Sequence, residues 1–252
     1  MIHVLAIEFP PISHVIEWPS GPLGINKVVV LMWVSVALVF GIMYAGSRKK
    51  ALVPKGTQNV AETAVDFVHN GIILETMGPD GMKFAPFLFT LFGFIFALNI
   101  WGIVPGAQMP VNARIALPMF MALLVWVIYL VVGIAKQGPL GYFKNAMFPP
   151  GVPWPLYFLV SPIELVQVLI VRPLSQAVRL FANMLAGHLL LTSFAIITAS
   201  LWSLSLLIVI WPFSFGLLVA LTAFEVLVCF LQAFIFTILT AVYIGSSLHP
   251  DH

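Results

Sequence analysis

Residues 172–191, RPLSQAVRLFANMLAGHLLL, contain two arginines, Arg172 and Arg179, and no acidic residue. A charge at the centre of a bilayer costs about 2.5–3.5 kcal/mol on insertion scales, and arginine cannot avoid this cost by losing its proton. If the stretch lies in a membrane, Arg179 therefore needs a carboxylate partner, a water-filled cavity, or both. The residues on either side indicate where the stretch lies.

The composition indicates an integral membrane protein. Of the 252 residues, 61% are hydrophobic and 8% are charged, whereas soluble domains contain about 25% charged residues. The net charge of +2 is too small to indicate a nucleic-acid partner. The single cysteine, Cys229, excludes an intrachain disulfide and a paired-cysteine metal site. We expect no metal and no cofactor.

Uncharged apolar runs predict the first three membrane crossings, at residues 28–47, 84–104 and 115–135. Each is long enough to cross the hydrocarbon core once. Between the first two, residues 57–77 alternate apolar and acidic residues at helical spacing, which predicts an amphipathic helix on the membrane surface. A Pro- and Gly-rich surface segment with a short amphipathic piece follows the third crossing.

Residues 161–247 are almost wholly apolar and predict a long helical hairpin, with a break near TASLWSLS (198–205) and Pro212 at the start of its second helix. Each helix would be on the order of 55–60 Å long, about twice the hydrocarbon thickness. Such helices must tilt steeply, kink, or lie partly in the membrane plane, and Pro173 is a candidate kink. The sequence therefore predicts one all-α membrane domain over residues 1–252, with five crossings and amphipathic surface helices.

Basic residues cluster after the first and third crossings: Arg48, Lys49, Lys50, Lys55, Lys136 and Lys144. Cytoplasmic loops are enriched in Lys and Arg, so both loops are expected to be cytoplasmic. The N-terminal segment 1–27 would then lie outside the cell, and five crossings would leave the C-terminus in the cytoplasm. Arg114 alone is a basic residue on the outer side.

Few carboxylates are available to Arg179. After Pro173, the sequence contains only Glu225 and the near-terminal Asp251. Glu164 lies several turns before Arg179, nearer the inner surface. Either Glu225 reaches Arg179 across the hairpin, or the partner carboxylate belongs to another chain.

Helical spacing bears on this choice. Residues three and four apart share a helix face, and one face carries Arg172, Ser175, Arg179, Asn183 and Ala186. His188 lies about half a turn around the helix from Arg179. If His188 meets Glu225 inside the hairpin, Arg179 points outward, towards another protein. Small residues would let a neighbouring helix approach closely: Ala182, Ala186 and Gly187.

Glu225 and Gln232 share one face of the second long helix. An ionisable residue inside a membrane indicates a functional site, and Glu225 facing His188 could form a proton relay because both side chains titrate. Asn99, in the second crossing, would extend the wet path outward. Simpler roles stay open: Gln232 and Asn99 could only join helices by hydrogen bonds, and Arg172 could reach lipid headgroups.

Two motifs, RPLSQAVRLFANMLAGH (172–188) and LQAFIFTILTAVY (231–243), together with LNIWGIVP (98–105), resemble subunit a of the bacterial F-type ATP synthase. The resemblance implies that the hairpin faces a rotating ring of c subunits and that Arg179 is the family's essential arginine. It also matches Asn183, Ser175 and Gln232 to positions of the family's motifs.

The sequence departs from the family pattern at three positions. Many relatives carry a carboxylate at position 188 and a histidine at position 225, so His188 and Glu225 are exchanged here. Gly102 replaces an aspartate of many relatives, and we therefore expect the entry route to depend less on that crossing. Because the exchange keeps both chemical types, it suits a relay between facing side chains.

The resemblance implies a proton-translocating stator subunit with two offset aqueous half-channels. Its partners would be the ring of c subunits, the b subunit of the stator stalk, the rest of the ATP synthase and membrane lipid, in a bacterial cell membrane. The outer half-channel would contain Glu225, His188, Gln232 and Asn99, and the inner one Arg172, Ser175 and Glu164. The chain would have no catalytic site of its own, since it has no GxxxxGK[ST] motif.

Two other readings remain at this point. A stand-alone secondary transporter or channel would place Arg179 opposite Glu225 in a substrate cavity. A structural membrane scaffold would tolerate substitutions at Arg179, Gln232 and Glu225.

Overall fold

The computed structural model of the chain describes residues 26–48, 55–104, 107, 110–148, 153–202 and 207–248. The predicted outer segment 1–27 falls almost wholly outside these residues, as do 203–206 and the C-terminal end. The described residues form helices and no strands: α2 (Lys27–Arg48), α3 (Thr57–Val68), η2 (His69–Ile73), α4 (Leu74–Thr76), η3 (Gly78–Phe84), α5 (Ala85–Ile100), η4 (Val111–Ala113), α6 (Ala116–Gln137), α7 (Pro139–Met147), η5 (Trp154–Leu156), α8 (Tyr157–Val166), η6 (Gln167–Val171), α9 (Arg172–Trp202), η7 (Leu207–Val209) and α10 (Trp211–Leu248).

Five helical stretches within this part of the chain are long and apolar enough to cross a membrane: Lys27–Arg48, Gly78–Ile100, Ala116–Gln137, Trp154–Trp202 and Trp211–Leu248. The prediction of an all-α membrane protein with five crossings is confirmed. The last two stretches contain 49 and 38 residues, which correspond to about 74 and 57 Å of helix. Both lengths exceed a hydrocarbon core of about 30 Å, so neither helix fits across a bilayer along its normal.

The first helix of the hairpin begins earlier than the sequence predicts, at Trp154 instead of residue 161. Pro155 lies in the first turn of η5, where a missing N–H is harmless because no helical acceptor precedes it. The helix then continues through Pro162 inside α8. A proline therefore starts this helix where the sequence pattern suggested only a surface link.

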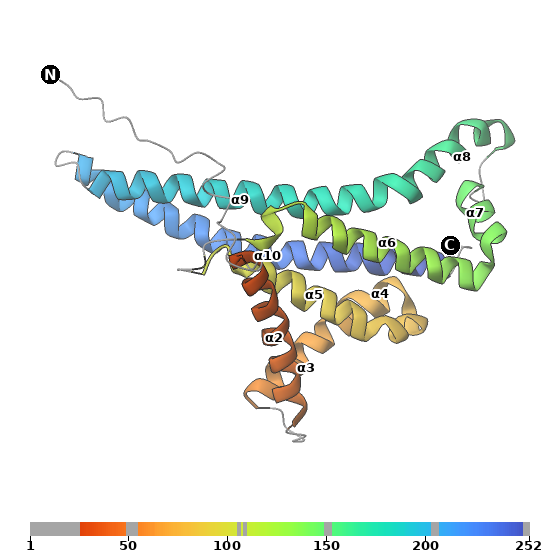
Figure 1. Cartoon of the computed structure of the whole chain (residues 1–252), viewed down its shortest axis with the longest axis horizontal. Coiled ribbons are helices and arrows are strands. Elements are labelled where there is room, and N and C mark those ends of the chain that lie inside the picture. The colour runs from red at the N-terminus through yellow and green to blue at the C-terminus, as the bar shows by residue number, and fades with distance from the viewer. Residues whose placement is uncertain are drawn as a thin grey trace.

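Helices α9 and α10 run side by side along the longest axis of the molecule, and α8 bends away from the line of α9 (Figure 1). Side-chain hydrogen bonds fix the register of this pair. Gln176 Nε2 donates to the Phe236 carbonyl at 3.1 Å and to Thr240 Oγ1 at 3.2 Å. Near the turn of the hairpin, the Thr198 and Ser214 hydroxyls are 2.8 Å apart.

The bend between α8 and α9 has a local cause. In the π-helix η6, the Arg172 N–H bonds five residues back to the Gln167 carbonyl. Pro173 has no N–H to continue this pattern to Val168. The Val168 carbonyl instead accepts a hydrogen bond of 2.6 Å from the Tyr129 hydroxyl on α6. The irregular turn therefore lies just before Pro173, and the Tyr129 hydroxyl of another helix satisfies its free carbonyl oxygen.

Replacing Tyr129 with phenylalanine should destabilise the fold. The change removes the hydroxyl that donates to the Val168 carbonyl of η6 at 2.6 Å, and an unsatisfied buried acceptor costs about 1–3 kcal/mol. A lower thermal unfolding midpoint of the detergent-solubilised protein would show this. Tyr243→Phe is the matched control, because the Tyr243 hydroxyl donates no hydrogen bond to another helix among the described residues. Equal midpoints for both variants would contradict the account.

The amphipathic segment 57–77 is helical but uses its apolar face differently from the prediction. Phe67 packs against three rings of α5 and α10, with centroid distances of 5.5–5.7 Å: Phe92, Phe230 and Phe234. Further residues of the segment are buried: Ala61, Val68, Ile72 and Ile73. The apolar face thus packs on protein. Helical spacing alone does not distinguish a protein surface from a lipid surface, since both accept the same apolar stripe.

Helices α5 and α6 pack along the hairpin, while α2 stands across the other long helices (Figure 1). The Trp101 indole N–H donates to Ser35 Oγ at 2.8 Å and joins the end of α5 to the middle of α2. The short helix η4 packs against α9. These contacts bring the end of α5 and the segment before α6 against the half of the hairpin nearer its turn, where Asn99, His188 and Glu225 line one pocket.

Candidate functional site

Arg179 lies on the exposed face of α9. Its exposed neighbours on that face are small or apolar: Val178, Ala182, Ala186 and Leu190. Within the described part of the chain, Arg179 has no hydrogen bond and no ion pair. Arg179 therefore lies on an apolar surface of a membrane helix and has no partner among the described residues. Its charge is available to bind another molecule.

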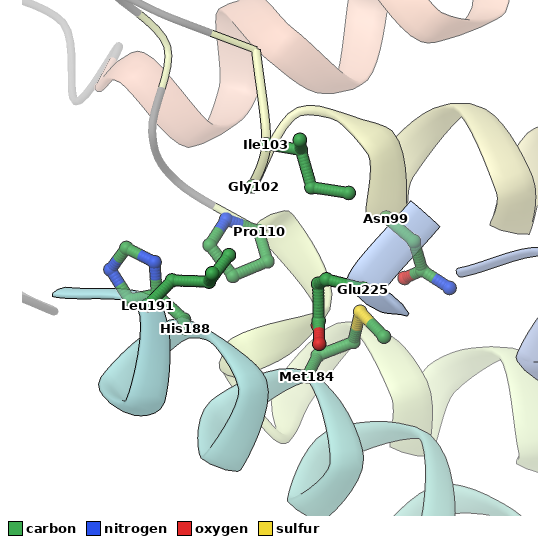
Figure 2. A pocket seen from close by; sticks show the side chains of 8 residues that line it. All are labelled: Asn99, Gly102, Ile103, Pro110, Met184, His188, Leu191 and Glu225. Atoms are coloured by element: carbon green, nitrogen blue, oxygen red, sulfur yellow. The ribbon is translucent and has the colours of Figure 1, made fainter. Parts of the chain in front are cut away.

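A small pocket lies on the other side of α9, where the hairpin meets the end of α5 and the segment before α6. It is lined by Asn99, Gly102, Ile103, Pro110, Met184, His188, Leu191 and Glu225. The empty volume is about 190 Å³, including its open side. In Figure 2, Glu225 lies between His188 and Asn99, and the three side chains come from α10, α9 and α5.

His188 and Glu225 are both buried, at 9% and 8% exposure. They line the same pocket, as the relay hypothesis requires, but no hydrogen bond joins them. The Glu225 carboxyl instead lies on the backbone of Gly187, where a Cβ atom would overlap both carboxyl oxygens. Gly187 therefore makes room for the Glu225 side chain between the two long helices.

The pocket does not contain Arg179. Among the described residues, no ion pair joins Arg179 to Glu225. The cavity expected for a stand-alone transporter, with these two charges facing each other, is therefore wrong for this chain. The two charges do not face each other because of helix geometry. The face of α9 that turns towards Glu225 carries His188, which lies about half a turn around the helix from Arg179.

Asn99 belongs to a polar pair that sequence reasoning missed. Asn112 on η4 donates from Nδ2 to Asn99 Oδ1 at 2.6 Å, and both side chains are fully buried. Asn99 Nδ2 and Asn112 Oδ1 have no hydrogen-bond partner in the described structure. Buried polar atoms of this kind are normally satisfied by protein or ordered water. The sequence signal was weak, because Asn112 lies in a connection between two spans and in no periodic pattern.

The Asn183 side chain points in a different direction from the one that the sequence predicts. Helical spacing assigned it to the outward face with Arg179, whereas its Nδ2 donates to Gln232 Oε1 on α10 at 3.2 Å. A residue four positions from Arg179 is rotated by about 40°, which is enough to bring its side chain to the edge of the hairpin interface. Gln232 is buried and Asn183 is half-buried.

The residues assigned to the inner side do not form one cluster. The Arg172 guanidinium lies 5.0 Å from the centre of the Tyr243 ring, a cation–π contact, so Arg172 does not simply extend to headgroups. Ser175 Oγ donates to the Arg172 carbonyl at 3.2 Å. Glu164 is half-buried on α8 and has no hydrogen bond or ion pair to described residues.

Comparisons with known proteins agree with the resemblance seen in the motifs. Residues 29–245 match the family described as ATP synthase A chain. The chain is 42% identical over 240 residues to the ATP synthase subunit a of Frankia alni, covering 92% of this chain and 81% of that protein. It is 42% identical over 254 residues to that of Hyphomonas neptunium, covering 98% of both chains. It is 44% identical over 224 residues to that of Rhodopseudomonas palustris, covering 88% and 87%. The chain therefore belongs to the ATP synthase A chain family.

Proposed function

We propose that this chain is the proton-translocating stator subunit of an F-type ATP synthase in a bacterial cell membrane. Membership of the ATP synthase A chain family supports the role in the membrane sector. The observation that carries the finer mechanism is the position of Arg179, exposed on an apolar helix face without a partner among the described residues.

Arg179 exchanges partners with the carboxylates of the c subunits. An arginine at membrane depth needs a counter-charge, and no described residue of this chain supplies one on this face, so we assign the counter-charge to another chain. Ala182 and Ala186, one and two turns further along α9, are exposed and small, so that a ring helix can approach closely. As the ring turns, Arg179 stabilises each deprotonated carboxylate and repels a proton that would pass directly between the half-channels.

Protons enter through the pocket that contains Asn99, His188 and Glu225. The Asn183–Gln232 pair follows this pocket along the hairpin in the direction of Arg179. A proton that reaches a ring carboxylate neutralises it, and a neutral carboxyl enters lipid far more cheaply than a charged one. After rotation the proton leaves on the inner side, near Arg172, Ser175 and Glu164. The membrane potential contributes about 2.3 kcal/mol per charge per 100 mV.

The ends of the helices support the expected orientation. Gln137 at the end of α6 donates to the Ser247 carbonyl near the end of α10 at 2.9 Å. The same end of the molecule carries Lys136 and Lys144 on α6 and α7. Basic residues favour the cytoplasmic side, so this end of the molecule faces the cytoplasm. The pocket with His188 and Glu225 lies nearer the turn of the hairpin and therefore opens to the outside of the cell.

Cross-linking tests the proposed contact with the ring. In a Cys229→Ala background, Ala182→Cys should form a disulfide with a cysteine placed one turn from the carboxylate of the c subunit. Ala177→Cys is the matched control: Ala177 lies on the same helix but is fully buried inside this chain, and it should not cross-link. Non-reducing gels of membranes that contain the assembled complex give the readout. Equal cross-linking at both positions, or none at Ala182→Cys, would contradict the proposal.

A further inference from the structure

The helical stretch that carries Arg179, Trp154–Trp202, contains one turn of a different kind. In the π-helix η6, the Arg172 N–H donates to the Gln167 carbonyl, five residues back. Just before this turn, the Gln167 N–H still reaches the Ile163 carbonyl, four residues back. A turn closed over five residues holds one residue more than an α-helical turn. The part of the helix before η6 is therefore rotated by about 100°, compared with an uninterrupted α-helix.

The buried face of this stretch shows the extra residue. Ser161 and Val168 are buried and lie seven residues apart, which is close to two turns of α-helix. The next buried residue is Pro173, five positions after Val168, and Ala177 follows four positions later. An uninterrupted α-helix would turn position 172 towards this face, whereas Arg172 is only half-buried. The face that packs on the protein thus advances by five residues at η6.

This extra residue decides on which side of the buried face Glu164 lies. Glu164 comes four residues before the buried Val168, and Arg172 comes four residues after it. In an uninterrupted α-helix the two charged residues would therefore lie on opposite sides of Val168, about 80° apart. Because η6 absorbs one residue, their spacing of eight counts as seven, and the angle falls to about 20°.

Glu164 thereby joins the line of the two arginines. Arg179 follows Arg172 by seven residues, which gives the same angle of about 20°. Glu164, Arg172 and Arg179 then follow one another along one side of the helix, at intervals of about two turns, or about 10 Å. Without η6, the carboxylate would lie on a different side of the helix from Arg172.

Two tyrosines from other helices hold η6 in place. Tyr129 of α6 is 1% exposed, and its hydroxyl donates to the Val168 carbonyl at 2.6 Å, which Pro173 cannot satisfy because it has no N–H. The ring of Tyr243 on α10 lies 5.0 Å from the Arg172 guanidinium. The two tyrosine rings contact each other, with their centroids 5.8 Å apart. One aromatic pair therefore supports both η6 and the residue that follows it.

We propose that η6 sets the angular position of Glu164, so that this carboxylate lies on the side of Arg172 and Arg179 and exchanges protons there with cytoplasmic water. The inference rests on the proposed function, since that function turns this side of the helix to the ring. Glu164 has no hydrogen bond or ion pair to described residues, so its oxygens can accept a proton. A proton from the cytoplasm binds a Glu164 oxygen and passes through water to a deprotonated ring carboxylate, which leaves Glu164 ionised again.

Moving the carboxylate by one position tests this register. Glu164→Gln should slow ATP-driven pumping by inverted membrane vesicles that contain the intact ATP synthase, whose cytoplasmic side faces the medium. At alkaline external pH we expect a loss of about tenfold, the low end of what a charge-lined entrance contributes to capture of an ion. The loss should shrink at acidic external pH, where protons are plentiful. Glu75→Gln, the same change at an exposed carboxylate of α4, should pump at the parental rate.

The double variant Glu164→Gln/Leu165→Glu separates the two registers. With η6 in place, position 165 lies about 120° from Arg172, so the double variant should be as slow as Glu164→Gln. In an uninterrupted α-helix, position 165 would lie only about 20° from Arg172. Recovery of the parental rate and pH dependence by the double variant would therefore overturn the inference.

Changing the length of η6 provides a second test. Ile170 lies in η6 and is 56% exposed, so its deletion removes little packing. The deletion leaves a spacing of seven between Glu164 and Arg172, which a plain α-helix places about 20° apart. This variant should pump at nearly the parental rate. Insertion of one alanine after Ile170 should instead slow pumping as Glu164→Gln does, because it rotates Glu164 by about 100°.

Assembly is checked by the amount of the subunit in the purified complex. Equal pumping rates for the assembled deletion and insertion variants would overturn the inference, as would a parental rate for Glu164→Gln at every external pH. Each of these results concerns only the inner side and leaves the proposed function in place. Coupled pumping by Arg179→Ala would instead overturn the proposed function, so the two failures are distinguishable.

Discussion

Replacing Arg179 with alanine is expected to abolish ATP-driven proton pumping by the assembled complex. Apart from Arg172, Arg179 is the only Lys, Arg, Asp or Glu residue of α9, and it lies on the exposed face of this helix. A deprotonated ring carboxylate would then face an apolar surface without a counter-ion, and an unpaired charge there costs several kcal/mol. The ring could no longer exchange protons in step with rotation. Quenching of a pH-sensitive dye in inverted membrane vesicles measures the pumping.

Arg48→Ala is the matched control for this experiment. Arg48 is exposed at the end of α2 and lies over the Tyr44 ring at 5.0 Å, away from the hairpin. We expect this variant to pump normally. Full ATP-coupled pumping by an assembled Arg179→Ala complex would refute the assignment of Arg179.

Replacing Glu225 with glutamine should slow proton entry by about 100-fold or more, the low end of the effects seen when a positioned proton-transfer group is lost. Glutamine has nearly the size of glutamate and keeps the packing on Gly187, but it cannot take up and release a proton. Initial rates of ATP-driven pumping at several pH values measure the effect, and the dependence of the rate on pH should become flatter.

Asp66→Asn provides the control for the loss of a carboxylate. Asp66 is exposed on α3 and does not line the pocket, so its variant should retain the parental rate. A Glu225→Gln complex that transports protons at the parental rate across the whole pH range would exclude Glu225 from the entry path.

Much of the fold follows from the sequence because apolar runs longer than a bilayer is thick have few alternatives to membrane helices. The same reasoning fails where tertiary contacts decide. The π-helix η6 depends on Pro173 and on a hydroxyl from α6 that lies far away in the sequence. The 57–77 segment packs on protein because Phe67 contacts three aromatic rings on other helices. Helical periodicity does not indicate which helices an apolar face will contact.

The sequence predicts the parts of the site that depend only on the fixed rotation of about 100° per residue in an α-helix. The half-turn between Arg179 and His188 predicts that they point to opposite sides of α9, and the structure places one on the exposed face and the other in the pocket. Asn183 was assigned to the wrong side because it lies at the edge of that face. Asn112 was missed because only the packing of η4 against α9 brings it to Asn99.

The most direct test of the central claim is a density map of the intact membrane sector that resolves the side chain of Arg179 and its surroundings. We predict that the carboxylate nearest to its guanidinium belongs to a c subunit of the ring, across the exposed face of α9. A map in which Arg179 is held by Glu225 or Glu164 of its own chain, with no ring carboxylate on that face, would contradict the account.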